Sequence, residues 1–254
     1  MSPPPAVVAR LRAAGCVFAE EEAALLTEAA GSAAELGALV ARRVDGEPLE
    51  QVLGWAAFCR LRIAVAPGVF VPRRRTEFLA REAIARTRPG AVVLDLCCGS
   101  GALAAAIAAA VPGVELHAAD VEPAAVQCAR RNLPGAQVYE GDLFAPLPPE
   151  LRGRVDVLVA NVPYVPAGEV ALMPPEARDH EPRQALDGGA DGLDVLRRVA
   201  AEAPAWLAAG GWLLSEVSER QAATAVAVLT AAGLTAHTAE DDDLGATVVL
   251  GARA

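Results

Sequence analysis

The sequence predicts an α/β protein: a seven-stranded, doubly wound, mostly parallel sheet, preceded by a small N-terminal helical domain and a linking β-hairpin. Two observations predict the sheet. Strand-like and helix-like segments alternate after Pro89 and Gly90, and such alternation builds right-handed crossovers between parallel strands, with helices on both faces. The last two strand segments are separated only by an acidic run and Gly245. This connection is too short for a crossover helix, so we expect the pair to run antiparallel.

The N-terminal part of the chain has two different patterns. Leucines at near-helical spacing between residues 19 and 44 predict two or three short helices, and Ser32 is a candidate cap for one of them. Aromatic and β-branched residues over 52–71, with a turn at Pro67 and Gly68, predict the hairpin. We therefore divide the chain into a helical region, a linker that contains the hairpin, and a main domain: residues 1–46, 47–75 and 76–254.

The strands of the main domain follow from short apolar runs bounded by turn residues. Gaps that separate most of them are long enough for a helix of about ten residues. The seven candidates are residues 92–95, 115–120, 136–139, 155–160, 211–217, 235–238 and 246–250.

Composition excludes several classes of protein. The chain has 254 residues, 54% of them hydrophobic and 21% charged, which suffices for a full core and excludes a disordered or disulfide-stapled protein. The formal net charge is -10, and all 22 basic residues are arginine. Generic adhesion to nucleic acid or to an anionic membrane is therefore disfavoured.

The cysteines and histidines predict a cytoplasmic protein without a metal site. The five cysteines are an odd number and Cys97 and Cys98 are adjacent, so a reducing cytoplasm is the simplest interpretation. The N-terminus lacks the basic start and unbroken apolar stretch of a signal peptide. The three histidines are too scattered for a metal site, and no cysteine pairs with one at zinc-ligand spacing.

A glycine turn after the first strand of the main domain is the first candidate ligand site. This strand contains Asp95, and Gly99 and Gly101 then open an alanine-rich helix. Glycine lets the backbone approach a ligand closely, and free amides at a helix start favour a carboxylate or phosphate. A tight strand-to-helix turn without a ligand would give the same pattern. The dinucleotide-binding pattern does not fit, because no third glycine follows at the required place.

Two more acids follow the next two strands. Asp120 ends the second strand, where a carboxylate accepts both hydroxyl hydrogens of a ribose in many nucleotide-binding sheets. The alternative is a helix cap, because Pro123 suits a first helical turn. After the third strand, Asp142 is a candidate acceptor from an adenine amino group, and Leu143 or Phe144 a candidate cover for the ring. A plain loop acid is the alternative for Asp142.

The segment NVPY, residues 161–164, directly follows the fourth strand. Ligands bind at the carboxyl ends of central strands in open α/β sheets, and an Asn161 amide with backbone carbonyls suits a planar NH2 group. The alternative is a turn begun by Asn161 with a packed Tyr164.

Together these residues resemble the class I S-adenosylmethionine-dependent methyltransferases, whose fold is Rossmann-like. Four segments in order narrow the resemblance to the protein-(glutamine-N5) methyltransferases that modify peptide-chain release factors, the HemK/PrmC family. They are EPLEQVLG (47–54), FVPRRRTE (70–77), NVPY (161–164) and HEPRQALDGG (180–189). The resemblance runs from about Ala41 to the C-terminus.

The resemblance implies methyl transfer from S-adenosyl-L-methionine, with S-adenosyl-L-homocysteine as product, to the side-chain amide of a protein glutamine. A release factor is the implied partner, held in part by the N-terminal helical region. The implied catalytic segment is Asn161, Val162, Pro163 and Tyr164. The implied cofactor contacts are Asp95, Cys97, Gly99, Gly101, Asp120, Val121, Asp142, Leu143 and Asn161. On the substrate side it implies Phe70, Arg73 and Glu77.

The chain departs from the family pattern in three places. Val162 stands where the family has proline, which adds an N–H and frees φ but keeps the carbonyl. Arg74 and Arg75 add two positive charges to the family's Pro-Arg-Pro-x-Thr-Glu. The helical region also looks shorter than usual.

Two other functions fit parts of the pattern. The Asn-x-Pro-Tyr grip also suits the exocyclic NH2 of a flipped base, as in an adenine-N6 methyltransferase, although the net charge of -10 disfavours it. A nucleotide-binding regulatory protein without turnover is the other alternative, and the intact Asn161, Pro163 and Tyr164 argue against it.

Overall fold

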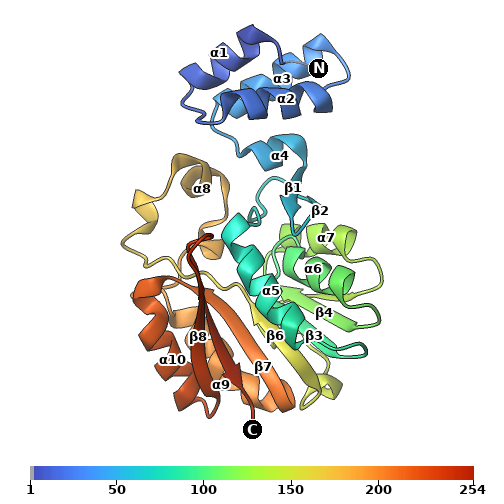
Figure 1. Cartoon of the computed structure of the whole chain (residues 1–254), viewed down its shortest axis with the longest axis vertical. Helices are drawn as coiled ribbons and strands as arrows, with labels where there is room; N and C mark the ends of the chain where they lie inside the picture. Colours follow the sequence, from blue (N-terminus) through green and yellow to red (C-terminus); the bar gives the residue numbers. More distant parts are fainter. Residues whose placement is uncertain (1–2) are drawn as a thin grey trace.

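A computed structural model describes residues 3–254. A bundle of short helices forms one end of the molecule, and a sheet covered by helices forms the other (Figure 1). The bundle helices are α1 (Pro5–Ala13), α2 (Ala19–Ala29), α3 (Ala33–Val44) and α4 (Leu49–Leu53).

The helical bundle confirms the predicted cap and adds a helix. The Ser32 hydroxyl accepts from the Glu35 N–H at 3.1 Å and so begins α3. Helix α1 lies before the leucine pattern and was not predicted. Inside the bundle, Arg43 donates from Nε to Glu22 Oε2 at 2.7 Å, and both side chains are nearly fully buried.

The hairpin forms, but its predicted turn is wrong. Strands β1 (Trp55–Phe58) and β2 (Leu61–Ala64) pair antiparallel, and the turn is Cys59 and Arg60 rather than Pro67 and Gly68. Both turn residues have positive φ, 48° and 64°, as a type I′ turn requires. Neither residue type favours that conformation, so the composition did not reveal the turn; residues 67–68 turn after the hairpin instead.

The main sheet has seven strands in the order β5-β4-β3-β6-β7-β9-β8. Five neighbouring strands are parallel, and β9 runs antiparallel to both β7 and β8, as predicted for the last pair. The bounds are β3 (Val92–Leu96), β4 (Glu115–Asp120), β5 (Gln137–Glu140), β6 (Val155–Ala160), β7 (Leu207–Val217), β8 (Thr235–Asp241) and β9 (Ala246–Ala252).

Helices cover both faces of the sheet, as the predicted doubly wound fold requires. Side chains of β3 alternate between the faces: Leu94 and Leu96 belong to the core under α9 and α10, whereas Val93 belongs to the core under α5 and α6. The helices are α5 (Glu77–Arg86), α6 (Ala102–Ala110), α7 (Pro123–Asn132), α8 (Pro175–His180), α9 (Asp194–Trp206) and α10 (Ala222–Ala231). Short 3-10 helices are η1 (Arg74–Thr76), η2 (Pro149–Leu151), η3 (Val170–Leu172), η4 (Arg183–Ala185) and η5 (Glu219–Gln221).

The strand order reverses between β3 and β6. From β3 the chain moves outward to β4 and β5, then returns to the other side of β3 with β6. Loops that leave neighbouring strands in opposite directions open a crevice at the carboxyl edge of such a sheet. Within residues 3–254, no helix has the length and apolar character to span a membrane.

Candidate active site

A cavity lies at the carboxyl ends of β3, β4, β5 and β6. The segment after each of these strands lines it: residues 97–100, 120–122, 141–143 and 161–165. Two further segments, 70–76 and 184–187, come from the linker and from the stretch before α9. The cavity therefore occupies the point at which the strand order reverses.

The cavity brings together most of the site residues predicted from the sequence. Those that line it are Phe70, Arg73, Cys97, Gly99, Asp120, Val121, Asp142, Leu143, Asn161, Val162, Pro163 and Tyr164. Asp95, Gly101 and Glu77 do not line it. Each of these three has another place in the structure.

The two glycines of the turn after β3 serve different purposes. Gly99 has φ +54°, and a Cβ there would meet nothing within 4 Å, so its backbone faces open space in the cavity. Gly101 has φ +77°, and a Cβ there would lie 2.9 Å from a methyl carbon of Leu133. Gly101 thus allows α6 to begin close against the end of α7, and only Gly99 is available to a ligand.

Asp95 lies behind the turn, fully buried. Its Oδ2 accepts from the Ala104 N–H at 3.2 Å, while Oδ1 has no hydrogen-bond partner within residues 3–254. Burial raises the pKa of Asp95 to about 8, opposed by the Ala104 N–H and reinforced by the nearby Asp120. Asp95 therefore holds the first turn of α6 from inside the sheet rather than lining the cavity.

Asp120 links the turn after β3 to the start of α7. Its Oδ2 accepts from the Gly99 N–H at 2.8 Å, and its Oδ1 accepts from the Glu122 N–H at 2.9 Å. Each carboxylate oxygen keeps a further lone pair for a ligand hydroxyl. Burial raises the pKa of Asp120, and these backbone bonds oppose the rise.

Asp142 is paired with a residue that the sequence interpretation missed. Arg198 of α9 donates from Nη2 to Asp142 Oδ2 at 2.5 Å, and both side chains are exposed. Arg198 also lines the cavity. Its only sequence signal was its place in an amphipathic helix, which does not point to a site.

Asn161 lines the cavity, and its side chain carries a buried acceptor without a donor. It follows β6 directly, and its Oδ1 is buried without a hydrogen-bond partner among the described residues. Leaving such a group unsatisfied costs about 1–3 kcal/mol. A ligand N–H in the cavity would remove that cost.

Tyr164 is fixed at the cavity wall by two side chains from other elements. Its hydroxyl donates to Glu216 Oε1 at 2.7 Å and accepts from Arg75 Nη2. Arg75 in turn donates from Nε to the same Glu216 oxygen at 2.9 Å. Burial raises the pKa of Tyr164. Glu216 lies near the carboxyl end of β7, and that position was the one sequence signal that could have found it.

The substrate-side residues divide into two groups. Arg73 donates from Nη2 to Glu181 Oε2 at 2.6 Å and lies over the Phe70 ring, with its guanidinium carbon 5.1 Å from the ring centroid. Arg73 and Phe70 both line the cavity. Glu77 instead accepts from the Cys59 N–H at 2.9 Å and so holds the hairpin turn. The structure therefore does not place Glu77 in the cavity wall.

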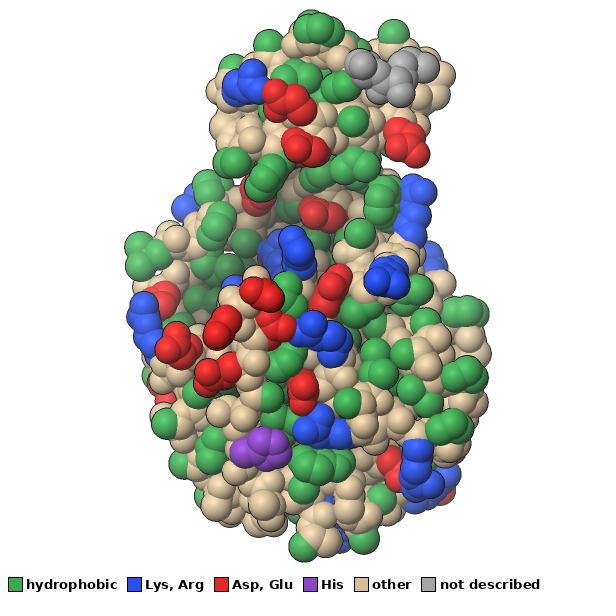
Figure 2. Space-filling view, viewed as in Figure 1, with side chains coloured by type: hydrophobic (Ala, Val, Ile, Leu, Met, Phe, Trp, Pro, Cys, Tyr) green, Lys and Arg blue, Asp and Glu red, His purple; other side chains and the backbone are tan. Residues whose placement is uncertain are grey.

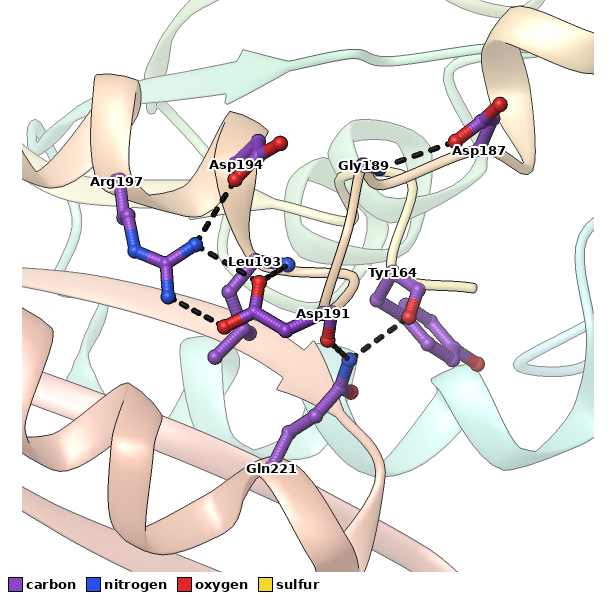
Figure 3. A network of polar contacts seen from close by, with 8 residues as sticks. All are labelled: Tyr164, Asp187, Gly189, Asp191, Leu193, Asp194, Arg197 and Gln221. Atoms are coloured by element: carbon purple, nitrogen blue, oxygen red, sulfur yellow. Dashed lines mark hydrogen bonds and ion pairs between the residues drawn. The ribbon is translucent and has the colours of Figure 1, made fainter. Parts of the chain in front are cut away.

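A glycine-containing loop, residues 188–192, packs against the 161–165 segment (Figure 3). The Gly188 N–H donates to the Val165 carbonyl at 2.8 Å, and Gln221 Nε2 donates to the Tyr164 and Asp191 carbonyls, both at 2.9 Å. Gly192 has φ +79°, and a Cβ there would lie 2.2 Å from the Tyr164 carbonyl oxygen. The sequence interpretation missed this support for Tyr164.

No cluster of three or more His, Cys, Asp or Glu side chains suited to a metal ion occurs in the part of the chain that the structure describes. The polar side chains of the cavity are instead carboxylates, two amides, hydroxyls and arginines. These groups suit an organic ligand with hydroxyl and amino groups.

Comparisons with known proteins agree with this chemistry. The family model "Methyltransferase small domain" matches residues 60–174. A release factor glutamine methyltransferase of Geobacter sulfurreducens is 40% identical over 219 residues, which are 85% of this chain and 76% of that protein. The 4-amino-L-phenylalanine/4-methylamino-L-phenylalanine methyltransferase of Streptomyces pristinaespiralis is 40% identical over 207 residues, 78% of this chain and 70% of that protein.

Among solved structures, a T. thermophilus 16S rRNA methyltransferase in complex with AdoMet and guanosine has the same fold. The TM-score is 0.57 at 22% identity, covering 79% of this chain and 50% of that chain. The seven-stranded sheet, the cavity at its carboxyl edge and the identity to the Geobacter protein over most of its length lead to one conclusion: the chain belongs to the release factor glutamine methyltransferase family.

Proposed function

We propose that this protein transfers a methyl group from S-adenosylmethionine to the side-chain amide nitrogen, N5, of a glutamine in a peptide-chain release factor. The observation that carries the proposal is the Asn161 Oδ1, a buried acceptor without a donor on a residue that lines the cavity. A primary amide supplies the N–H that this atom lacks. The name of the Geobacter relative, most of whose length matches this chain, supports the same reaction.

The residues present fit the proposed cofactor. Asp120 keeps lone pairs for ribose hydroxyls beside the exposed backbone of Gly99, and Leu143 provides an apolar wall next to Asp142. When bound, S-adenosylmethionine supplies an electrophilic methyl group on a sulfonium sulfur. Asp120, Gly99 and Val121 would hold the nucleoside part, while Asn161 lies nearer the reacting end.

The residues of the chain itself would act by orienting the target amide. An amide nitrogen is a weak nucleophile because its lone pair is delocalised into the carbonyl. Asn161 Oδ1 and the Val162 carbonyl would accept the two amide hydrogens and so fix the direction of that lone pair. Ideal positioning of this kind is worth up to about 7–11 kcal/mol of barrier. Tyr164, held by Glu216 and Arg75, would cover the amide from one side.

The partner and compartment follow from the same reasoning. We propose that the helical bundle α1–α4 contacts the release factor, since Val17 and Phe18 are exposed there at 84% and 66%. We also propose a cytoplasmic protein that forms no stable complex with nucleic acid. Five free cysteines and a net charge of -10 support these two points.

The test is a methyl-transfer assay on separate substrates. The purified chain is incubated with labelled S-adenosylmethionine and a release factor, DNA, RNA or 4-amino-L-phenylalanine, and the products are located by mass spectrometry. We expect label on a release-factor glutamine at a rate orders of magnitude above the others. We include 4-amino-L-phenylalanine as an alternative substrate because one relative is named for methylating it. Label mainly on nucleic acid or on the amino acid would overturn the proposal.

A further inference from the structure

A second pocket lies beside the cavity and shares part of its wall. Arg75 and Tyr164 line both. The second pocket is otherwise formed by the end of β7, by η5 and by the connection between β8 and β9. A group bound there would lie one side chain away from the proposed amide site.

The second pocket is strongly acidic. Its lining holds five carboxylates and a single basic side chain, Arg75; the carboxylates are Glu216, Glu219, Glu240, Asp241 and Asp242. We call it the acidic pocket. Figure 2 shows acidic side chains gathered on this face, where Figure 1 has the tip of the β8–β9 connection.

Few of these charges are neutralised within the protein. Arg75 pairs with Glu216, and Arg81 pairs with Asp241. Glu219, Glu240 and Asp242 form no ion pair with any residue in the described range 3–254. The acidic pocket therefore keeps a net negative field, which attracts a cation.

One residue that lines the acidic pocket also carries a buried atom without a partner. The Glu216 side chain is only 3% exposed. Its Oε1 accepts hydrogen bonds from Arg75 and Tyr164, while Oε2 accepts no hydrogen bond from any described residue. A carboxylate oxygen that is withdrawn from water and left without a donor is costly, and a cationic N–H donor satisfies it best. This observation is independent of the exposed acids.

We infer that the acidic pocket binds a basic side chain of the protein substrate, one that lies close in space to the target glutamine. The inference rests on the proposed function, because the acidic pocket adjoins the proposed amide site through the wall formed by Arg75 and Tyr164. Arginine suits the pocket better than lysine, since its fork of N–H donors reaches several carboxylates at once. Such a contact would select among glutamines that fit the amide site equally well.

The test compares two double variants with intact release factor as substrate. Glu240→Gln with Asp242→Asn removes two exposed charges from the acidic pocket and leaves Glu216, Arg75 and Tyr164 in place. Glu150→Gln with Glu202→Gln removes two exposed charges that lie outside both pockets and outside the helical bundle, and serves as the matched control. At low salt we expect the pocket variant to raise KM for the release factor about fivefold or more with kcat unchanged, and the control to leave both unchanged. At high salt the difference should fade.

A mutant cycle then identifies the partner group. Each arginine or lysine near the methylated glutamine of the release factor is replaced by methionine, and KM is measured with the wild-type chain and with the pocket variant. One replacement should raise KM for the wild type but cause no further rise in the pocket variant.

Two results would overturn the inference and leave the proposed function intact. Equal KM for wild type and pocket variant would remove the pocket from substrate binding, and equal rises in both double variants would assign the effect to net charge alone. If the wild-type chain methylates no release-factor glutamine, the proposed function fails first and the inference falls with it.

Discussion

The side-chain amide of Gln221 donates to the backbone carbonyl of Tyr164 at 2.9 Å, although 57 residues separate the two. The same Nε2 donates to the Asp191 carbonyl, and Oε1 accepts from the Ser218 N–H and hydroxyl at 3.0 and 2.8 Å (Figure 3 draws the two Nε2 bonds). This buried amide thus uses all four of its hydrogen-bonding positions. A single side chain joins the loop after β6, the loop before α9 and the start of α10.

Replacing Gln221 tests whether this support matters for turnover. Gln221→Met keeps the volume but leaves the Tyr164 and Asp191 carbonyls and Ser218 without partners, which costs about 1–3 kcal/mol per buried group. We expect kcat to fall about tenfold or more, while the Kd for S-adenosylmethionine changes little because Asp120 is untouched. Steady-state kinetics and calorimetry measure the two quantities. A folded Gln221→Met protein with wild-type kcat would contradict a positioning role.

Two glycines with nearly the same positive φ, one in this loop and one outside it, give a matched test. Gly192 and Gly113 have φ of +79° and +80°, but a Cβ meets the Tyr164 oxygen at 2.2 Å only at Gly192 and meets nothing within 4 Å at Gly113. Gly113→Ala should cost about 1–2 kcal/mol of stability and leave kcat unchanged. Gly192→Ala should cost more and also lower kcat, because the Tyr164 segment must move. Thermal unfolding and kinetics that show equal losses for both would mean that the close approach is unimportant.

Asn161→Ala tests the proposed hydrogen bond between the Asn161 side chain and the target amide. It removes one of two acceptors for the target amide, so kcat should collapse while cofactor affinity stays nearly constant. Val162→Pro serves as the control, because the carbonyl at position 162 survives and the backbone is only stiffened. The measurement is methyl transfer beside calorimetric titration. If Asn161→Ala retains most of its rate on every amide and amine substrate, the 161–164 segment is only a turn.

Asp120→Ala tests the proposed ribose contact. We expect cofactor binding to weaken by about 1.5–3 kcal/mol, the usual worth of hydrogen bonds to a charged group. Asp120→Asn is the companion variant, because it keeps an acceptor for the Gly99 N–H at 2.8 Å. Calorimetry with S-adenosylmethionine measures both. Wild-type affinity in folded Asp120→Ala would remove Asp120 from the cofactor site.

Asp95 makes stability depend on pH. Burial raises its pKa from about 3.8 when unfolded to about 8 when folded. Its contribution to stability is therefore fully present below about pH 4 and is lost as pH rises toward about 8. Asp95→Asn cannot ionise, so its free energy of unfolding should decline less over this window than that of the wild type. Urea unfolding at several pH values measures this, with exposed Asp243→Asn as the control; parallel curves for Asp95→Asn and wild type would contradict it.

The sheet was predictable because apolar runs and turn residues are local signals. Strands β4 and β6 were predicted with the bounds that the structure has, and the antiparallel last pair followed from a short connection. The hairpin turn was not predictable in the same way. Cys59 and Arg60 adopt positive φ because β1 and β2 impose it, not because these residue types prefer it.

The cavity was predictable where its residues directly follow strands, as Asp120 and Asn161 do. The supporting residues were not, because they come from elements distant in the sequence. Arg198 comes from the middle of α9 and Gln221 from η5, and neither has a neighbour in sequence that suggests a site. Gly101 and Glu77 show the opposite problem: each belongs to a motif, yet one accommodates helix packing and the other holds the hairpin.

The position of β9 within the sheet constrains when the protein can fold during synthesis on a ribosome. β9 is translated after β7 and β8, yet it lies between them and is the only strand that pairs with β8 among the described residues. Until residues 246–252 leave the exit tunnel, the open edge of β7 and the whole of β8 have no partner. Unpaired strand edges invite association with other chains. A nascent chain that lacks β9 therefore exposes strand edges that the complete sheet pairs.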